Sequence, residues 1–265
     1  MKNILVPIGT SQTSHETLQY AIDFAVEFSA NVFVMDVFSA SSKTGSLANI
    51  TEKIAKSSKE RLREVIDKTE AKNIDIKIAT YNGDIVDGIN QIDKELGLDL
   101  IILAPRSNDI KEELYLGRTS GKIIKRTDIP TLLVPKGSIK KDFKKILVAF
   151  KSGVIKRHRI LDALDTIRKN QNSKVNLLLV KTPGYTDEDL RVNTALMDIS
   201  SNLTLTENAT TYLGVTEHFK SHEPDLLCVF RRKRGFFKKL WEKTTISKSE
   251  FFAPIPVLVL SVNNH

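Results

Sequence analysis

The sequence is poor in the features that mark disulfide-bonded and membrane-spanning proteins. It contains one cysteine, Cys228, and no run of eighteen or more apolar residues. A lone cysteine excludes an intrachain disulfide, and we expect Cys228, which lies in an apolar run, to be a buried small hydrophobe. We expect no membrane span. The first residues, MKNILVPIG, have the pattern of a strand and not of a secretory signal. We therefore expect a cytoplasmic protein.

The sequence also lacks the short motifs of several enzyme classes. It has no GxSxG, no P-loop and no CxxC. His218 and His222 are four residues apart on an expected helix, but the sequence HFKSH has no glutamate in the HExxH position. A solvated helix face explains this spacing better than a metal site does. We can name no catalytic set and no metal ligands, and we expect the protein not to be an enzyme.

Positive charge is concentrated in the second half of the chain. Residues 1–138 carry 18 Lys and Arg against 19 Asp and Glu, a net charge of −1. Residues 139–265 carry 22 against 13, a net charge of +9. The basic half permits an anionic partner without identifying one.

Residues 99–136 have the pattern of a strand, a polar loop, a helix and a second strand. The strands are the apolar runs Leu100–Ala104 and Thr131–Val134, and the helix-like segment is Leu116–Arg126. Neither run alternates with polar residues, which is typical of parallel strands buried on both faces. In such βαβ units, ligands bind at the loop that follows the first strand and precedes the helix.

The same unit recurs near the C-terminus. Asp225-Leu226 corresponds to Asp99-Leu100 with an offset of 126, and an Ile-Pro pair precedes the last strand of both units at the same offset. KKILVAF near residue 144 likewise repeats KNILVPI near residue 2. This internal repeat predicts two domains, residues 1–137 and 143–265, joined by a lysine-rich linker.

Each half is predicted to alternate strands with helices. The expected N-terminal caps of two helices are Ser14 and Asp84. The second half is shorter by sixteen residues between its second and fourth strands. Besides the repeated units, the expected strands are 3–8, 31–38, 75–80, 144–150, 175–180 and 203–206, and the expected helices are 14–26, 50–72, 84–96, 156–169, 187–201 and 211–222.

Two five-stranded units that begin ILVP and ILVA and end IPTLLVP and IPVLVL resemble the universal stress protein family in its tandem form. The strongest markers are the first-strand phrase and the paired segments LGRTSGKIIKRTDIPTLLV and KLWEKTTISKSEFFAPIPVLVL. The resemblance covers nearly the whole chain. It implies an α/β fold of two tandem Rossmann-like (adenine nucleotide alpha hydrolase-like) domains. Each would be a five-stranded parallel sheet of order 3-2-1-4-5 with helices on both faces.

The resemblance also implies a small cytoplasmic protein of stress response, and some members of the family bind ATP. Those members carry Gly, two residues, Gly, nine residues, Gly and then Ser or Thr after the fourth strand. Glycine lets the backbone approach phosphate, and the helix N-terminus offers free amides. The matching positions here are Ala104, Ser107, Gly117 and Arg118, followed by Thr119. Only one of the three glycines is present, and a turn glycine at the start of a helix is its simpler explanation.

The residues that would contact adenine also match those of the ATP-binding members only in part. The first strand of the family usually ends with an aspartate that contacts the adenine ring, and Gly9 stands there; Val37 matches the second-strand wall. The resemblance therefore points to one degenerate nucleotide site, with the candidates Gly9, Val37, Ala104, Ser107, Gly117, Arg118 and Thr119.

In the second half, no glycine remains at the matching positions. Lys151 takes the place of the aspartate, and the motif positions hold Phe230, Lys233, Lys243 and Thr244. Because Phe230 is bulky and Lys151 replaces the carboxylate, we expect no nucleotide there.

Two phenylalanines are interspersed among basic residues in Arg231–Lys239, RRKRGFFKK. Such runs can bind single-stranded nucleic acid or an anionic surface. A solvated loop whose phenylalanines pack onto the sheet is the simpler explanation. One short run does not supply the several positioned side chains of a specific reader, so we predict no specific nucleic-acid binding.

The fifth strands of the two halves, Thr131–Val134 and Val257–Leu260, would be prone to aggregate as open edges. In the family, dimers pair at this edge. We therefore expect the halves to pack as a pseudo-two-fold pair through these strands, with further homodimerisation left open.

The expected function is that of a non-enzymatic stress-response module, regulatory or interacting with a partner protein, with no required cofactor. ATP is a disfavoured ligand. Two alternatives stay open. The first is an adenine-nucleotide sensor with weak ATPase activity in the first half. The second is a binder of nucleic acid or another anionic partner through the basic second half.

Overall fold

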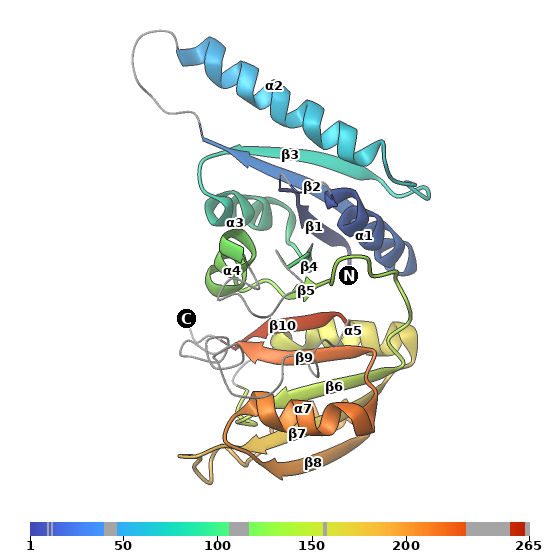
Figure 1. The fold of residues 1–265 in the computed structure, drawn as a ribbon, viewed down its shortest axis with the longest axis vertical. Coiled ribbons are helices and arrows are strands. Elements are labelled where there is room, and N and C mark those ends of the chain that lie inside the picture. Colours follow the sequence, from blue (N-terminus) through green and yellow to red (C-terminus); the bar gives the residue numbers. More distant parts are fainter. Residues whose placement is uncertain are drawn as a thin grey trace.

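One ten-stranded sheet runs through the whole protein, with helices on both of its faces (Figure 1). A computed structural model describes residues 1–9, 11, 13–39, 47–105, 117–155, 158–231 and 255–262. The strand order is β3-β2-β1-β4-β5-β10-β9-β6-β7-β8. Each half thus has the order 3-2-1-4-5, and all pairs are parallel except β5 with β10. The predicted fold class is confirmed.

The elements alternate along the chain as the sequence pattern predicts. The first half contains β1 (Asn3–Pro7), α1 (Ser14–Phe28), β2 (Asn31–Phe38), α2 (Leu47–Ile66), β3 (Ile76–Asn82), α3 (Ile85–Leu96), β4 (Leu100–Leu103), α4 (Gly117–Arg126) and β5 (Thr131–Leu133). The second half contains β6 (Lys145–Phe150), the 3-10 helix η1 (His158–Leu161), α5 (Asp162–Gln171), β7 (Lys174–Lys181), α6 (Thr194–Asp198), β8 (Asn202–Glu207), α7 (Thr211–His222), β9 (Leu226–Arg231) and β10 (Val257–Ser261).

The prediction of a helix over residues 187–201 is wrong in extent. Only the five residues of α6 are helical. The backbone N–H of Thr186 and its hydroxyl donate to the Asp189 carboxylate, at 3.0 and 2.9 Å. Such local side-chain bonds compete with helix formation. The Asn193 side chain then accepts from the N–H of Ala195 at 2.9 Å and starts the helix late.

Other helix ends also differ from the prediction. Asp84 caps α3 as expected by accepting from the N–H of Val86 at 2.9 Å. Ser14 does not cap α1: it is the first helical residue, and its hydroxyl donates to the carbonyl of Ser11 at 2.7 Å. The helix predicted over 156–169 begins as η1. The helix predicted over 50–72 ends at Ile66, whose carbonyl accepts from the Thr69 hydroxyl at 2.7 Å.

The central strands are buried on both faces, which explains their unbroken apolar sequence. Ile4 and Leu5 of β1 point to opposite faces, and both are fully buried. One face packs against α1, α2 and α5, and the other against α3, α4 and α7. Cys228 of β9 is buried as predicted, and burial raises the pKa of its thiol. Within the described part of the chain, no helix has the length and apolar character needed to cross a membrane.

The two halves join where β5 meets β10. The strands are antiparallel, with Leu132 opposite Leu258 and Thr131 opposite Val259. Each strand covers the edge that the other would leave open, which removes two aggregation-prone edges at once. The predicted contact through the fifth strands is confirmed.

We predict that Leu258→Asp weakens the whole protein by about 3–5 kcal/mol in free energy of unfolding, because it buries an unpaired carboxylate at the joint. Leu258 is fully buried. Leu203→Asp on β8 is the matched control, since Leu203 is 40% exposed and should lose less than about 1 kcal/mol. Urea denaturation followed by circular dichroism measures both. Equal midpoints for the two variants would contradict the proposed importance of the joint.

Candidate functional site

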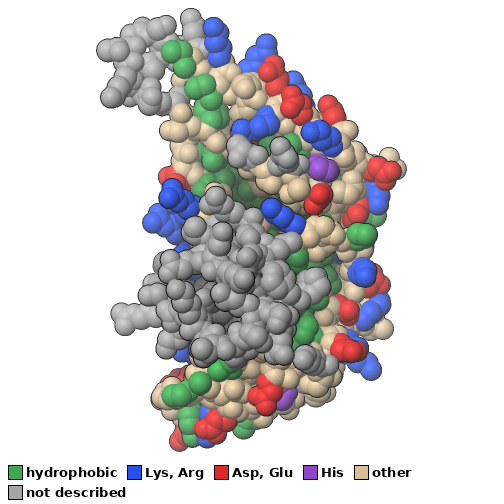
Figure 2. Space-filling view, viewed as in Figure 1, with side chains coloured by type: hydrophobic (Ala, Val, Ile, Leu, Met, Phe, Trp, Pro, Cys, Tyr) green, Lys and Arg blue, Asp and Glu red, His purple; other side chains and the backbone are tan. Residues whose placement is uncertain are grey.

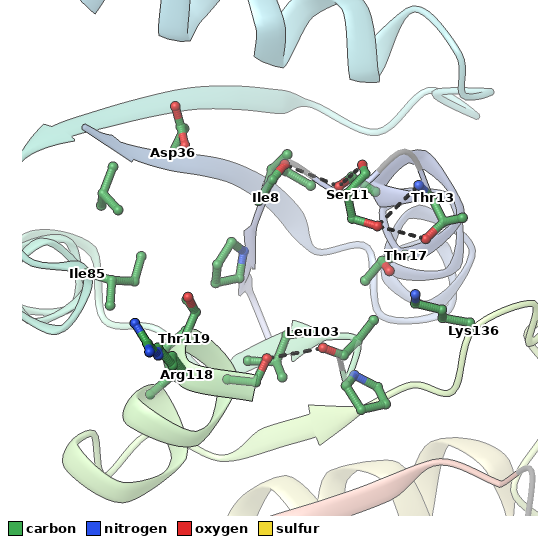
Figure 3. Close-up of a pocket in the computed structure, with 18 of the residues that line it drawn as sticks. Ile8, Ser11, Thr13, Thr17, Asp36, Ile85, Leu103, Arg118, Thr119 and Lys136 are labelled. Carbon is green, nitrogen blue, oxygen red and sulfur yellow. Dashed lines mark hydrogen bonds between the residues drawn. The ribbon is translucent and has the colours of Figure 1, made fainter. Parts of the chain in front are cut away.

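A cavity of about 680 Å³ opens in the first half at the carboxyl ends of β1, β2 and β4. The first turns of α1 and α4 lie on either side of it (Figure 3). Strand connections leave β1 and β4 in opposite directions along the sheet, and ligands bind parallel sheets at such a point.

Five of the seven candidate residues line this cavity: Gly9, Val37, Ala104, Arg118 and Thr119. Gly117 is the first residue of α4, directly before Arg118. Ser107 lies outside the described residues. The fold thus brings together residues from the ends of three strands and the start of one helix.

The position after β1 is open. The N–H of Ile8 continues the ladder by donating to the carbonyl of Met35 at 2.7 Å, and Gly9 follows at the cavity wall. A Cβ added to Gly9 would meet no atom within 4 Å. This position therefore has room for a side chain, although the sequence supplies none.

The first turn of α4 faces the cavity from the other side. The Ser120 hydroxyl donates to the carbonyl of Ala104 at 3.1 Å and ties this turn to the end of β4. Arg118 and Thr119 are exposed, and the turn contains no acidic residue. A cation beside the N-terminal end of a helix favours an anion.

Hydroxyl groups line the wall formed by α1. Those of Ser11 and Thr13 lie 3.0 Å apart, and the Ser14 hydroxyl contacts the carbonyl of Ser11. Lys136, just after β5, reaches the cavity on this side (Figure 3). The cavity therefore has a cation on each of two walls, Arg118 and Lys136.

Sequence reasoning missed Asp36 and Arg61, which also line the cavity. Asp36 lies in β2, is 4% exposed, accepts from the Ser58 hydroxyl and forms an ion pair with Arg61. Both partners belong to α2, so this carboxylate is already satisfied by the protein. A charged residue inside the apolar strand NVFVMDVF was the available signal, but the sequence does not reveal its partner.

An ion pair holds α3 against α4 beside the cavity. Lys122 of α4 donates to the carboxylate of Asp84, the residue that caps α3. The pKa of Asp84 is held below its ordinary value, first by the hydrogen bond from Lys122 and then by that from the N–H of Val86.

The matching positions of the second half are arranged differently. Lys151 is exposed after β6. Phe230 is buried in β9, and its ring centroid lies 6.0 Å from that of Phe150. Phe230 therefore belongs to the core. Lys233, Lys243 and Thr244 lie outside the described residues.

The interpretation of Arg231–Lys239 as one basic loop needs a correction. Arg231 is the last residue of β9 and is only 7% exposed, while 232–239 lie outside the described residues. Basic and acidic side chains are interspersed along the right-hand margin of the described surface in Figure 2. Among the described residues, no group of three His, Cys, Asp or Glu could hold a metal ion.

Comparison with known proteins identifies the family. A model of the universal stress protein family matches residues 1–135. The chain belongs to the universal stress protein family. A universal stress protein of Methanocaldococcus jannaschii is 29% identical over 140 residues, which are 51% of this chain and 82% of that protein.

Two crystal structures match the fold of this chain over both halves. A universal stress protein from Archaeoglobus fulgidus has a TM-score of 0.71 at 18% identity, with 98% of each chain covered. A functionally unknown protein from Pseudomonas aeruginosa has a TM-score of 0.54 at 15% identity, covering 99% of this chain and 93% of that one. At these identities the comparisons establish the fold.

We predict that Lys122→Met raises the pKa of Asp84 toward the ordinary aspartate value of 3.8. The carboxyl of Asp84 stabilises the fold fully above the unfolded pKa, and this contribution is lost as the pH falls through the lower folded pKa. The variant should therefore lose part of the acid dependence of stability. NMR titration of the carboxyl carbon measures the pKa. Lys125→Met, in the same helix, is the control, and an equal pKa in both variants would refute the role of Lys122.

Proposed function

We propose that this universal stress protein is a non-enzymatic, cytoplasmic stress-response module that acts through a partner protein. We further propose that its first half binds a phosphate-bearing anion with little preference for adenine. The observation that carries the proposal is the cavity with Arg118 on the first turn of α4 and Lys136 opposite.

The charge of the cavity supports an anion. Arg118 and Lys136 supply two cations, and the N-terminal ends of α1 and α4 add the positive ends of their helix dipoles. Asp36 is the one carboxylate among the described lining residues, and Arg61 neutralises it.

The same walls argue against tight binding of ATP. Gly9 offers no carboxylate to the adenine amino group, and Ala104 places a methyl group where glycine would let the backbone approach phosphate. A hydrogen bond to a charged group contributes about 1.5–3 kcal/mol. Loss of two such interactions weakens binding by about a hundredfold or more.

Hydrolysis would need a general base within reach of the attacking water. Among the described lining residues there is no histidine, and the carboxylate of Asp36 already accepts from Ser58 and Arg61. This arrangement supports a binding role over a catalytic one.

An adenine-nucleotide sensor with weak ATPase activity is the second candidate. The cavity volume falls within the range of about 300–1,000 Å³ that is usual for small-molecule sites, and the position of Gly9 is open. The nucleic-acid alternative has less support, since the first residue of its basic run is buried in the sheet.

We expect Mg-ATP and Mg-tripolyphosphate to bind with similar dissociation constants of about 1 mM, because the phosphates supply the contacts and the base adds little. A ³¹P NMR titration at low salt measures both. Arg118→Ala should weaken each about tenfold, and Arg126→Ala at the other end of α4 is the matched control. A low-micromolar constant for ATP alone, or steady release of phosphate from ATP, would favour the sensor.

Gly9→Asp should raise the affinity for ATP relative to tripolyphosphate by about tenfold or more, because it restores an acceptor for the adenine amino group. The site has room for the side chain. Gly9→Ala fills the same space without the carboxylate and serves as the control. The ratio of the two constants cancels the repulsion between the new charge and the phosphates. An unchanged ratio would show that the base does not lie beside this position.

A further inference from the structure

Both helices that begin at the anion cavity are held at their far ends by residues outside the first half. The first turns of α1 and α4 line the cavity, while their last turns lie beside the second half (Figure 1). The same arrangement therefore occurs twice, on the two helices whose N-terminal ends line the cavity.

The anchor of α4 is Arg231 at the end of β9. Its guanidinium donates to the carbonyl of Lys125 at 2.8 Å, the carbonyl of Thr127 at 2.9 Å and the carboxylate of Asp128 at 2.7 Å. It also contacts the hydroxyl of Ser261, which donates to Asp128 at 2.6 Å. One side chain of the second half thus ties the last turn of α4, the following loop and the end of β10.

The anchor of α1 is built around Glu27 in its last turn. Lys140 of the linker pairs with the Glu27 carboxylate, and Gln171 at the end of α5 donates to it. The side chain of Asn170 donates to the carbonyl of Glu27 at 3.2 Å. Both helices are therefore tied down at the ends opposite the cavity.

We expect the Arg231 contacts of α4 to affect the anion site more than the Glu27 contacts of α1 do. A cation at a helix C-terminus satisfies carbonyls that have no partner within the helix and offsets the helix dipole. Burial lowers the pKa of Arg231, and the charge of Asp128, which pairs with the guanidinium, opposes this shift. Since α4 has only ten residues, about 15 Å, an anchor at its end constrains the orientation of its start.

Taking the proposed anion site as given, we propose that Arg231 of the second half is a positioning residue for the site in the first half. It fixes the last turn of α4, so that the first turn presents Arg118 and Thr119 to the cavity. The second half thereby becomes part of a binding site to whose described lining it contributes no residue. Because such coupling is reciprocal, an anion in the cavity also strengthens the Arg231 contacts.

The test compares Arg231→Met and Arg231→Lys with wild type in the full chain. Methionine keeps most of the side-chain length without the charge, and lysine keeps the charge without the forked donors. Arg168→Met is the control, because Arg168 pairs with Asp165 inside the second half. Two measurements are made on each protein: the dissociation constant of tripolyphosphate by ³¹P NMR, and hydrogen exchange of the amides of 121–124 without ligand.

We expect Arg231→Met to weaken tripolyphosphate binding about fivefold to tenfold and to speed exchange at 121–124. Arg231→Lys should be intermediate, and Arg168→Met should match wild type in both measurements. If Arg231→Met lowers the melting temperature but leaves tripolyphosphate affinity and hydrogen exchange at 121–124 unchanged, Arg231 only stabilises the fold, and the proposal is overturned. If Arg231→Met does not fold, the same two measurements on Arg231→Lys decide.

The experiment separates this proposal from the proposed function. If wild type binds no tripolyphosphate while exchange at 121–124 rises in Arg231→Met, the anion site is refuted and the positioning of α4 by Arg231 stands. If wild type binds and both Arg231 variants bind equally well, the anion site stands and the positioning role is refuted.

Discussion

The antiparallel pairing of β5 with β10 is the constraint on which the rest of the protein depends. In each half, the apolar fifth strand would be an open edge of a five-stranded parallel sheet. Here β5 and β10 pair with each other, so each covers the edge of the other. The pairing merges two sheets into one of ten strands and sets the last turns of α1 and α4 beside the second half. The contacts of Arg231 and Glu27 across the halves follow from this geometry.

The cavity and the joint lie at opposite ends of the same helix. The first turn of α4 meets the cavity through Arg118, and its last turn meets Arg231. Between these two ends, Lys122 in the middle of α4 pairs with Asp84 and so holds the helix against α3. In a universal stress protein that has one of three glycines at the matching positions, we propose that this fixed placement of α4 contributes much of the affinity of the proposed anion site.

Repetition made the fold predictable from the sequence. The Asp-Leu pair and the Ile-Pro pair of the first unit both recur 126 residues later, and this constant offset identified two βαβ units. The apolar strands of these units indicated parallel pairing and the joint between the fifth strands. Interactions between distant segments could not be predicted. The partner of Asp36 lies on another element, and Arg231 stands in a basic run that resembles a loop. The short length of α6 depends on the hydrogen bonds of the Asp189 side chain, and the spacing of apolar residues gives no information on such bonds.

The linker between β5 and β6 changes the physics of the joint. Two separate subunits would associate to an extent set by their concentration, whereas a short tether makes the same contact at a high local concentration that dilution cannot alter. At this joint, each half therefore meets the other far more often than it meets the corresponding half of another molecule. Because the two halves are parts of one chain, their sequences can diverge while they stay paired. Here the first half has a cavity, and the second half has the buried Phe230 at the matching position.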